Sequence, residues 1–457
     1  MTQNADAPLV LEGSFKRASA PSQLRITDIR IAHVTGAPMR CPLIKMTTNQ
    51  GIEGYGEVRD AASPQYAAML RRHLIGENPC DVDRLFRRIK QFGGHARQGG
   101  GVSGIEVALM DLAGKAYGVP CYQLMGGKFR DCIRIYCDTD THGRPDGRAM
   151  GEALCKRMQR GFTFLKMDLG ISQLAGTTGT ISAPLGYLES IAKLQRQTRE
   201  AADEAAPAEA RRRLYDANNV PHPFTGIHLT EKGLDALEAY VAEVRSVIGD
   251  EVPLAVDHLG HIAVEDVINL ARRVEKYHLA WLEDAIPWQY TDQYLRLSQS
   301  TTVPICTGED IYLKEGFRPL LEARAVSVIH PDLLTAGGML ETKKISDLAL
   351  EHGVAMAMHM AESPIGALAA VHTAAACENF YVLEYHSADV DWWDDLVLGA
   401  AKPLVQQGFI TVPEQPGLGI ESLNDELIAQ HIDPTSPEVW TPTDEWDSDW
   451  SHDRLWS

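Results

Sequence analysis

The chain has 457 residues, of which 44% are hydrophobic and 23% are charged. These values are ordinary for a globular enzyme and exclude a disordered, a collagen-like and a small disulfide-stabilised protein. Lysine and arginine together number 43 against 62 aspartate and glutamate residues, which gives a formal net charge of −19 at pH 7. Because a nucleic-acid-binding surface needs positive charge to replace the counterions of the phosphates, nucleic acid is excluded as a partner.

The cysteines and the start of the chain indicate a cellular compartment. The eight cysteines are scattered, and none follows another at the C-x-x-C spacing of zinc and redox sites. The first residues lack the basic and apolar segments of a signal peptide, and no apolar run approaches the roughly 18 residues that span a bilayer. We therefore expect a cytoplasmic protein with reduced thiols and no membrane contact.

The first part of the chain combines strand and helix patterns. Residues 24–60 alternate in a β-like way, with a turn at residues 49–51, and predict a small antiparallel sheet. Helical periodicity follows at residues 67–74 and 103–117, where Gly118 and Pro120 end the second helix. An α+β unit is expected here.

Short buried strands alternate with amphipathic helices in the rest of the chain, and this alternation predicts a parallel (β/α)8 barrel. The eight strand candidates are residues 133–136, 162–167, 252–256, 280–282, 303–306, 326–329, 354–358 and 381–383. Residues 171–230 interrupt the second unit with a Gly/Thr/Ser-rich stretch and a charged helical segment at residues 188–214. An insertion after a strand end lies on the catalytic face, so we expect a lid or a contact between subunits of a homo-oligomer.

Ionisable residues stand just after six consecutive strand candidates. Each follows the previous one by 23 to 27 residues, about the length of one strand–helix unit, and they are Asp257, Glu283, Glu309, Asp332, His359 and Glu384. A single acid after a strand is most often a helix N-cap or a solvated loop residue. Six in register predict a cluster at the rim where barrel enzymes carry out their chemistry.

The first three of these residues predict a metal site. Three carboxylates packed together repel one another and raise one another's pKa unless a cation lies between them. Because Asp257, Glu283 and Glu309 offer only oxygen ligands, we expect a hard ion, Mg²⁺ or Mn²⁺. Such an ion also explains how an acidic protein binds an anionic substrate.

A second group of residues predicts acid–base chemistry. His359 follows the strand next to the one that carries Asp332, and a carboxylate on one imidazole nitrogen makes the other a base near neutral pH. The alternative is a core histidine that bonds a backbone carbonyl. Lys166 and Asp168 point the same way from the second strand, because side chains in a strand alternate. Lys166 can bind a carboxylate or act as a base, or it is a solvated strand end.

These residues belong to sequence motifs that resemble those of a known family over nearly the whole chain. It resembles the mandelate racemase subgroup of the enolase superfamily, and the motifs that carry the resemblance form an ordered set that also includes Asp257, His359 and Glu384. The matching stretches are GIEGYGEV (51–58), SGIEVALMDLAGKAYGVPCYQLMGGK (103–128), FLKMD (164–168), WLEDAIP (281–287), TGED (307–310), HPDLLTAGGM (330–339) and PGLGIE (416–421).

The resemblance implies a fold, a cofactor and roles for residues. It implies an α+β capping domain built from both termini on a modified (β/α)8 barrel, with Mg²⁺ held by the three carboxylates. It also implies that His359 and Asp332 form the base and that Glu384 lies near the carboxylate or enolate oxygens of the substrate. The expected domains are residues 1–130, then 131–395 with the insertion, then 396–457, which end in a tryptophan-rich acidic tail.

Two departures from the subgroup limit the roles that can be transferred. Its racemases resemble Lys-x-Lys at the second strand, whereas this chain has Asp168 in place of the second lysine. Several dehydratases resemble Asp-x-His at the third strand, where this chain has Leu259, with His258 and His261 beside it. The general acid stays open among His258, His261 and Lys166, and His359 itself returns the proton if elimination is syn.

We expect a lyase that abstracts the proton α to the carboxylate of a sugar acid and eliminates water to give a 2-keto-3-deoxy acid. Asp168, His258, His261 and Glu384 are the expected substrate contacts. A cycloisomerase or epimerase that uses the same enolate is the first alternative, and a non-catalytic ligand-binding barrel is the second. Loops near residues 34–45 and 59–60, together with the insertion, are expected to set the specificity.

Overall fold

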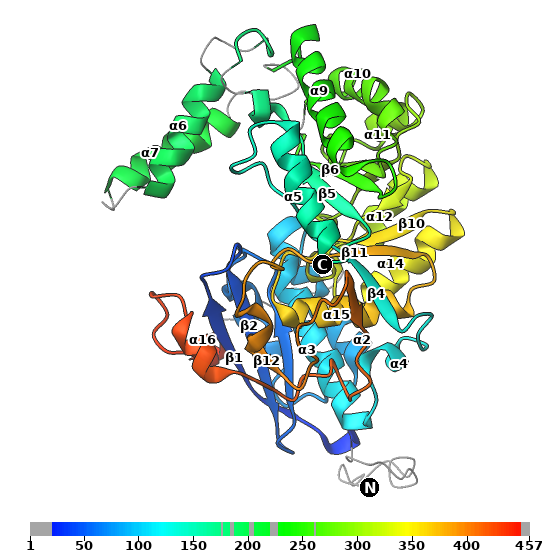
Figure 1. Cartoon of the computed structure of the whole chain (residues 1–457). Coiled ribbons are helices and arrows are strands. Elements are labelled where there is room, and N and C mark those ends of the chain that lie inside the picture. The colour runs from blue at the N-terminus through cyan, green and yellow to red at the C-terminus, as the bar shows by residue number, and fades with distance from the viewer. Residues whose placement is uncertain are drawn as a thin grey trace, which may run out of the picture. The chain divides into compact units, whose positions relative to one another are not determined.

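We describe a computed structural model of the chain (Figure 1). The structure describes residues 21–174, 177–182, 187–200, 205–219, 227–259 and 262–448. The chain forms two compact units, and each is described by itself. The first unit comprises Met1–Ile135, Glu309–Arg318 and His330–Ser457, and the second comprises Tyr136–Gly308 and Pro319–Ile329.

An antiparallel sheet in the first unit has the strand order β15-β1-β2-β3. Its strands are β1 (Ile26–Val34), β2 (Cys41–Thr48), β3 (Glu53–Glu57) and β15 (Thr441–Pro442). The long helix α3 (Gly100–Tyr117) packs on this sheet, and its close approach explains the glycines of β3. A Cβ on Gly56 would lie 2.1 Å from the backbone oxygen of Gly104, so no larger residue fits there.

The C-terminal segment returns to this sheet. Strand β15 pairs antiparallel with β1, and the Thr443 hydroxyl donates a hydrogen bond to the backbone oxygen of Ile29. The buried Trp440 donates its indole N–H to Asp425 at 2.8 Å, and Lys45 lies over its ring. The tail is therefore held to its own chain as far as it is described, and Trp450 and Trp456 lie outside the described residues.

A nine-stranded sheet forms the barrel-like part of the fold, in the order β13-β4-β11-β10-β9-β8-β7-β6-β5. Neighbouring strands from β5 to β9 pair in parallel, as do β10 and β11. The strands are β4 (Cys132–Tyr136), β5 (Leu165–Asp168), β6 (Leu254–Asp257), β7 (Trp281–Glu283), β8 (Ile305–Thr307), β9 (Val328–Ile329), β10 (Ala355–Met358), β11 (Phe380–Glu384) and β13 (Phe409–Thr411). The predicted fold class, a modified barrel with an α+β capping sheet, is confirmed.

One strand of this sheet was not predicted. Strand β13 pairs antiparallel with β4 and belongs to the C-terminal segment, where no strand–helix alternation marks it. A further pair, β12 (Val397–Leu398) with β14 (Ser422–Leu423), lies in the same segment. Strands of two or three residues carry too little alternation to be recognised without their partners.

Helices follow the barrel strands as the alternation predicts. Their bounds are α5 (Gly147–Gln159), α9 (Glu231–Ile248), α10 (Val264–Val274), α11 (Thr291–Ser298), α12 (Leu313–Glu322), α13 (Leu333–Ala336), α14 (Met339–Glu351) and α15 (Pro364–Ala376). N-caps explain several starts: the side chains of Asp146, Thr230 and Ser363 each accept a backbone N–H from the first turn of their helix. Further described helices are α1 (Gln65–Ala68), α2 (Val82–Ile89), α4 (Cys121–Leu124) and α16 (Asp425–Gln430).

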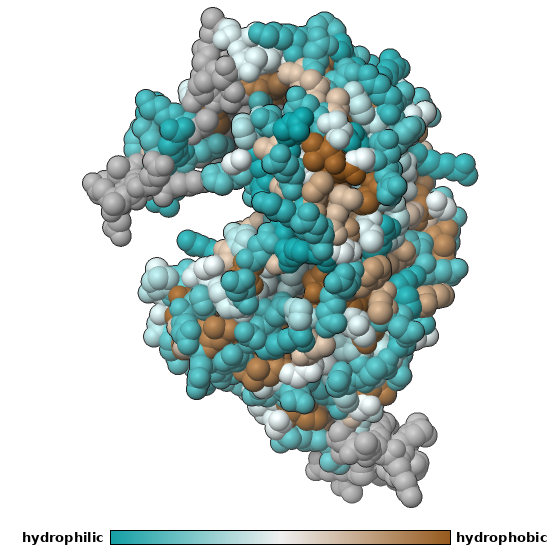
Figure 2. Space-filling view, in the orientation of Figure 1, coloured by the Kyte–Doolittle hydropathy of each residue, from teal (hydrophilic) through white to brown (hydrophobic). Residues whose placement is uncertain are grey.

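The described residues of the insertion include two helices where the sequence predicted one helical segment. Helices α6 (Tyr187–Glu200) and α7 (Ala205–Asn219) pack against each other in the second unit (Figure 1). The face in Figure 2 is mostly hydrophilic, with hydrophobic residues in scattered patches. Among the described residues no helix is long and apolar enough to cross a membrane.

Candidate active site

The residues predicted at the barrel rim fall in both units. Glu309, Asp332, His359 and Glu384 belong to the first unit, and Lys166, Asp168, Asp257, His258 and Glu283 belong to the second. His261 lies outside the described residues. The geometry is therefore given for each unit separately.

In the first unit, Asp332 and His359 lie on neighbouring strand ends and form a hydrogen bond. Asp332 follows β9 and caps α13, and its Oδ1 accepts the N–H of Leu334 at 2.6 Å. Its Oδ2 lies 2.6 Å from Nδ1 of His359, which follows β10. This bond directs Nε2 of His359 to the carboxylates of Glu309, at 2.9 Å, and of Glu384, at 3.7 Å.

The two members of this pair shift each other's pKa. Burial by itself would lower the pKa of His359, but the charges of Glu309 and Glu384 and the bond to Asp332 raise it well above its usual value. Burial would raise the pKa of Asp332, but Arg59 and His359 outweigh burial and lower it. Asp332 is thus held as a carboxylate that accepts the Nδ1 proton, the arrangement that leaves Nε2 to exchange protons.

A buried arginine supports the pair, and its position could not be predicted. Arg59 follows β3, its side chain is fully buried, and its Nη1 lies 3.4 Å from Oδ2 of Asp332. Its Nε lies 2.6 Å from Asp60 and 3.3 Å from Glu362, and Nη1 donates to the backbone oxygen of Glu309 at 3.0 Å. The sequence suggested residues 59–60 only as part of a specificity loop, because an arginine after a strand ordinarily lies in solvent.

Glu362 is a second residue that the sequence analysis missed. Burial, followed by the nearby charge of Asp332, raises its pKa well above the usual value. Its side chain is 1% exposed, so burial favours the neutral form of this carboxyl group beside the dyad. The only feature of the sequence that could have indicated Glu362 as a site residue is its position three residues after His359.

In the second unit, Lys166 lies between two of the predicted metal ligands. Its Nζ is 2.8 Å from Oδ2 of Asp257 and 3.1 Å from Oε1 of Glu283. In the parallel register Lys166 on β5 is level with Ala255 on β6 and with Trp281 on β7, and its side chain meets the acids two residues farther along these strands. Two carboxylates that face one ammonium group form a donor set that also suits a hard cation.

Asp168 and His258 form a neighbouring pair in this unit. Nε2 of His258 lies 3.7 Å from Oδ1 of Asp168 and 3.8 Å from Oδ2 of Asp257. His258 has a φ of 60°, a left-handed conformation that turns the chain directly after the strand. Burial and the charge of Asp138 raise the pKa of Asp168 to about 8, whereas the charge of Asp257 raises that of His258.

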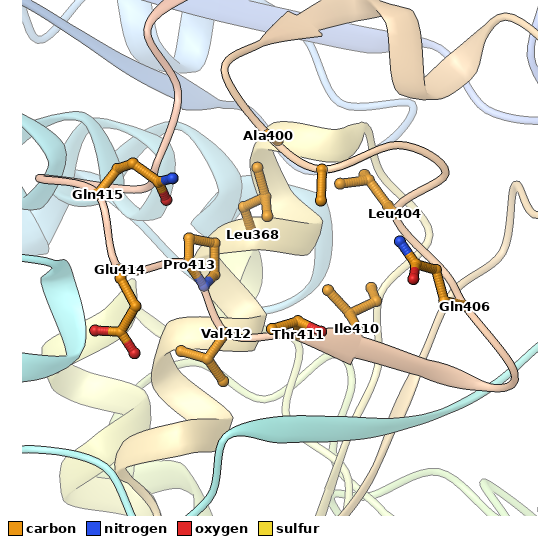
Figure 3. A pocket seen from close by; sticks show the side chains of 11 residues that line it. Leu368, Ala400, Leu404, Gln406, Ile410, Thr411, Val412, Pro413, Glu414 and Gln415 are labelled. Carbon is orange, nitrogen blue, oxygen red and sulfur yellow. The ribbon is translucent and has the colours of Figure 1, made fainter.

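A cavity of about 220 Å³ in the first unit contains none of the predicted site residues. Its wall comes from α15 and from the C-terminal segment, and Figure 3 shows Leu368, Leu404 and Ile410 around it. Glu414, at its edge, is already bound by Tyr122 and Lys128. The cavity is mostly apolar and carries no acid–base pair, so it is not the candidate active site.

Comparison with known families and proteins agrees with this geometry. Residues 149–426 match the family described as Enolase C-terminal domain-like, and residues 17–126 match the mandelate racemase / muconate lactonizing enzyme N-terminal domain. The chain is 34% identical over 416 residues to a D-xylonate dehydratase of Haloferax volcanii, a match that covers 89% of each chain. It is 27% identical over 444 residues to a D-galactonate dehydratase of Ralstonia pickettii, covering 93% of this chain and 99% of the relative.

A solved structure shows the same fold. The mandelate racemase/muconate lactonizing enzyme-like protein of Rubrobacter xylanophilus has a TM-score of 0.75 and 29% identity, over 91% of this chain and 100% of that protein. The predicted class of enzyme, a dehydratase of the enolase superfamily, is confirmed. The chain belongs to the mandelate racemase / muconate lactonizing enzyme family of the enolase superfamily.

Proposed function

We propose that this protein is a Mg²⁺-dependent hydro-lyase that dehydrates a sugar acid to a 2-keto-3-deoxy acid. The observation that carries the proposal is the 2.6 Å contact between His359 and Asp332, which leaves Nε2 of a buried imidazole beside Glu309 and Glu384. The relatives named above are dehydratases of D-xylonate and D-galactonate, which supports a pentonate or hexonate as the substrate.

Membership of the enolase superfamily implies a divalent cation. Asp257, Glu283 and Glu309 are the proposed ligands, with Mg²⁺ or Mn²⁺ as the ion. Asp257 and Glu283 flank a positive charge, the Lys166 ammonium group, so their donor chemistry fits a cation. For Glu309 the support is its place in the strand-end series.

The reaction begins with transfer of the proton on the carbon α to the substrate carboxylate to Nε2 of His359. Asp332 keeps the proton on Nδ1 and stabilises the imidazolium that forms. A cation held by Asp257, Glu283 and Glu309 would, together with Lys166, stabilise the negative charge that develops on the carboxylate oxygens of the substrate. Glu384, which is fully buried 3.7 Å from His359, is the proposed contact to those oxygens.

Dehydration then breaks the C–O bond at the β-carbon. The leaving hydroxyl takes a proton and departs as water, and the remaining enol rearranges to the 2-keto acid. His359 supplies this proton if elimination is syn. His258 is the proposed donor for anti elimination, because its side chain is 64% exposed and its Nε2 lies 3.7 Å from Oδ1 of Asp168.

A substrate screen tests the proposal. Purified protein with Mg²⁺ is incubated with pentonates, hexonates and aldarates, and 2-keto acids are detected as coloured semicarbazones. We expect product from at least one aldonate, with loss of product in the presence of a chelator. Epimerised or cyclised substrate without a 2-keto acid would instead indicate an epimerase or cycloisomerase. Failure of every sugar acid to exchange its α-hydrogen would indicate a ligand-binding barrel.

A further inference from the structure

Strand β7 carries a tryptophan and an acid two residues apart. Successive side chains of a strand alternate, so Trp281 and Glu283 project from the same face. Nε1 of Trp281 donates a hydrogen bond to Oε2 of Glu283 at 2.7 Å, and both side chains are fully buried. The indole N–H is a donor only, so this contact always directs a hydrogen at the carboxylate.

The other carboxylate oxygen has a different partner. Oε1 of Glu283 accepts from the Lys166 ammonium group at 3.1 Å. The rigid ring of Trp281 therefore fixes one oxygen of Glu283, and the Lys166 ammonium group contacts the other oxygen. An N–H bond to a carboxylate is charge-assisted and stronger than a neutral one, so Trp281 fixes the plane in which the carboxylate lies.

An aromatic cluster fixes the indole itself. The Trp281 ring lies 4.9 Å from the ring of Phe164 and 6.1 Å from that of Tyr136. Phe164 is two residues before Lys166, as Trp281 is two residues before Glu283. The same alternation thus places an aromatic layer, defined by Tyr136, Phe164 and Trp281, next to the ionic layer of Lys166 and Glu283.

We propose that Trp281 is a positioning residue that fixes Glu283 so that its Oε1 faces the proposed Mg²⁺ ion. The inference rests on the proposed function, in which Glu283 is a metal ligand. Partners that bond to the far side of a metal ligand commonly change metal affinity by about 10- to 100-fold when they are removed. Trp281 adds no charge to the site, so its effect acts only through the orientation of Glu283.

The test compares two buried tryptophans. Trp281→Phe removes the N–H and keeps an aromatic ring, and we expect Mg²⁺ binding by calorimetry, or Mn²⁺ binding by electron paramagnetic resonance, to weaken about 10- to 100-fold. The matched control is Trp393→Phe, since Trp393 is also fully buried and donates its N–H to the backbone oxygen of Glu362 at 3.3 Å. The control is expected to lose stability but to keep its metal affinity.

Kinetics add a readout that a purely structural role would not change. Turnover by Trp281→Phe is expected to need a higher Mg²⁺ concentration and to recover most of its kcat when Mg²⁺ is saturating. Unchanged metal affinity in folded Trp281→Phe overturns the inference. If that variant does not fold, Phe164→Leu loosens the indole and keeps its N–H, and equal metal affinity in that variant overturns the inference as well.

Glu283→Gln separates this inference from the proposed function. If Glu283→Gln loses metal binding while Trp281→Phe keeps it, only the positioning role is wrong. If Glu283→Gln keeps metal binding, Glu283 is not a ligand, and the proposed ligand set fails together with the inference.

Discussion

Nδ1 of His359 lies 2.6 Å from Oδ2 of Asp332, and the two residues follow adjacent strands of the barrel. Oδ1 of the same carboxylate accepts the backbone N–H of Leu334, so both oxygens of Asp332 are held. The imidazole cannot turn without breaking this bond. One tautomer and one direction of Nε2 are therefore imposed before any substrate arrives.

Replacement of His359 tests whether it is the base. His359→Asn is expected to lose turnover by at least the roughly 10²- to 10⁴-fold that a positioned acid–base group contributes. Exchange of the substrate α-hydrogen in deuterated water, followed by NMR, should disappear as well. The control is His372→Asn, since His372 is a fully buried histidine outside the site, whose pKa burial lowers to about 4. That variant should lose stability and still exchange the α-hydrogen.

The wild-type protein should process only one configuration at the α-carbon, because Asp168 occupies the place of a second lysine. Rapid exchange by His359→Asn, or equal processing of both α-epimers by the wild type, would show that a second base is present.

Glu309 is the expected third metal ligand. Its replacement should weaken metal binding without unfolding the protein. Its buried partner Arg59 keeps Asp60, Asp332 and Glu362 as counter-charges, so Glu309→Gln should not unfold the unit. We expect calorimetry to show weakened Mg²⁺ binding, and turnover to be lost. Asp310→Asn is the matched control, because Asp310 is the adjacent acid and pairs with Arg97 at 3.6 Å. Equal Mg²⁺ affinity in Glu309→Gln and the wild type would remove Glu309 from the ligand set.

Lys166 should oppose metal binding while it supports the reaction. Its ammonium group contacts both Asp257 and Glu283, and a positive charge at that distance repels an incoming cation. Lys166→Met is therefore expected to bind Mg²⁺ more tightly than the wild type and to lose turnover by at least about 10²-fold. Weaker Mg²⁺ binding in a folded Lys166→Met protein would contradict this electrostatic interpretation.

Stability should depend on pH through Glu106, a buried residue of α3. Its oxygens accept the N–H groups of Met339 and Leu340 at 2.7 and 3.1 Å, yet burial outweighs these bonds and raises its pKa to about 8. The ordinary pKa is 4.5, so the folded state holds an extra proton between the two values. Its contribution to stability is complete below about pH 4.5 and falls as pH rises toward 8, by a few kcal/mol at most.

Denaturant unfolding at pH 5, 6.5 and 8 measures this effect. Glu106→Gln is expected to be less stable than the wild type at pH 5, because an amide cannot accept both N–H groups through its two end atoms. The difference between the two proteins should shrink as pH rises. A constant difference across the series would show that Glu106 has the same pKa in the folded and unfolded chains.

Local patterns account for much of the architecture. Strands β6 and β10 are short apolar runs that begin and end within a few residues of their predicted bounds, because strand alternation and helix periodicity are properties of neighbouring residues. The acids at the strand ends were recognisable for the same reason, since a repeated unit length gives them a common position. The pairing of Asp332 with His359 follows from adjacent strands.

Contacts between residues far apart in the chain determine features of the fold that the local sequence patterns do not predict. Strand β13 exists only because residues 409–411 meet β4, far away in the chain. The burial of Arg59 beside Asp332 and Glu362 depends on three segments that are distant in sequence, and nothing near Arg59 in the chain indicates it.

The sequence by itself therefore determined the order of the elements, the barrel class and the strand ends that carry ionisable groups. Only the tertiary structure decided which atoms meet: Lys166 with Asp257 and Glu283, and Trp281 with one particular oxygen of Glu283. The physical reason is that periodicity arises from the backbone geometry of consecutive residues. Hydrogen-bond partners, burial and pKa shifts instead arise from the surroundings that the folded chain builds around each side chain.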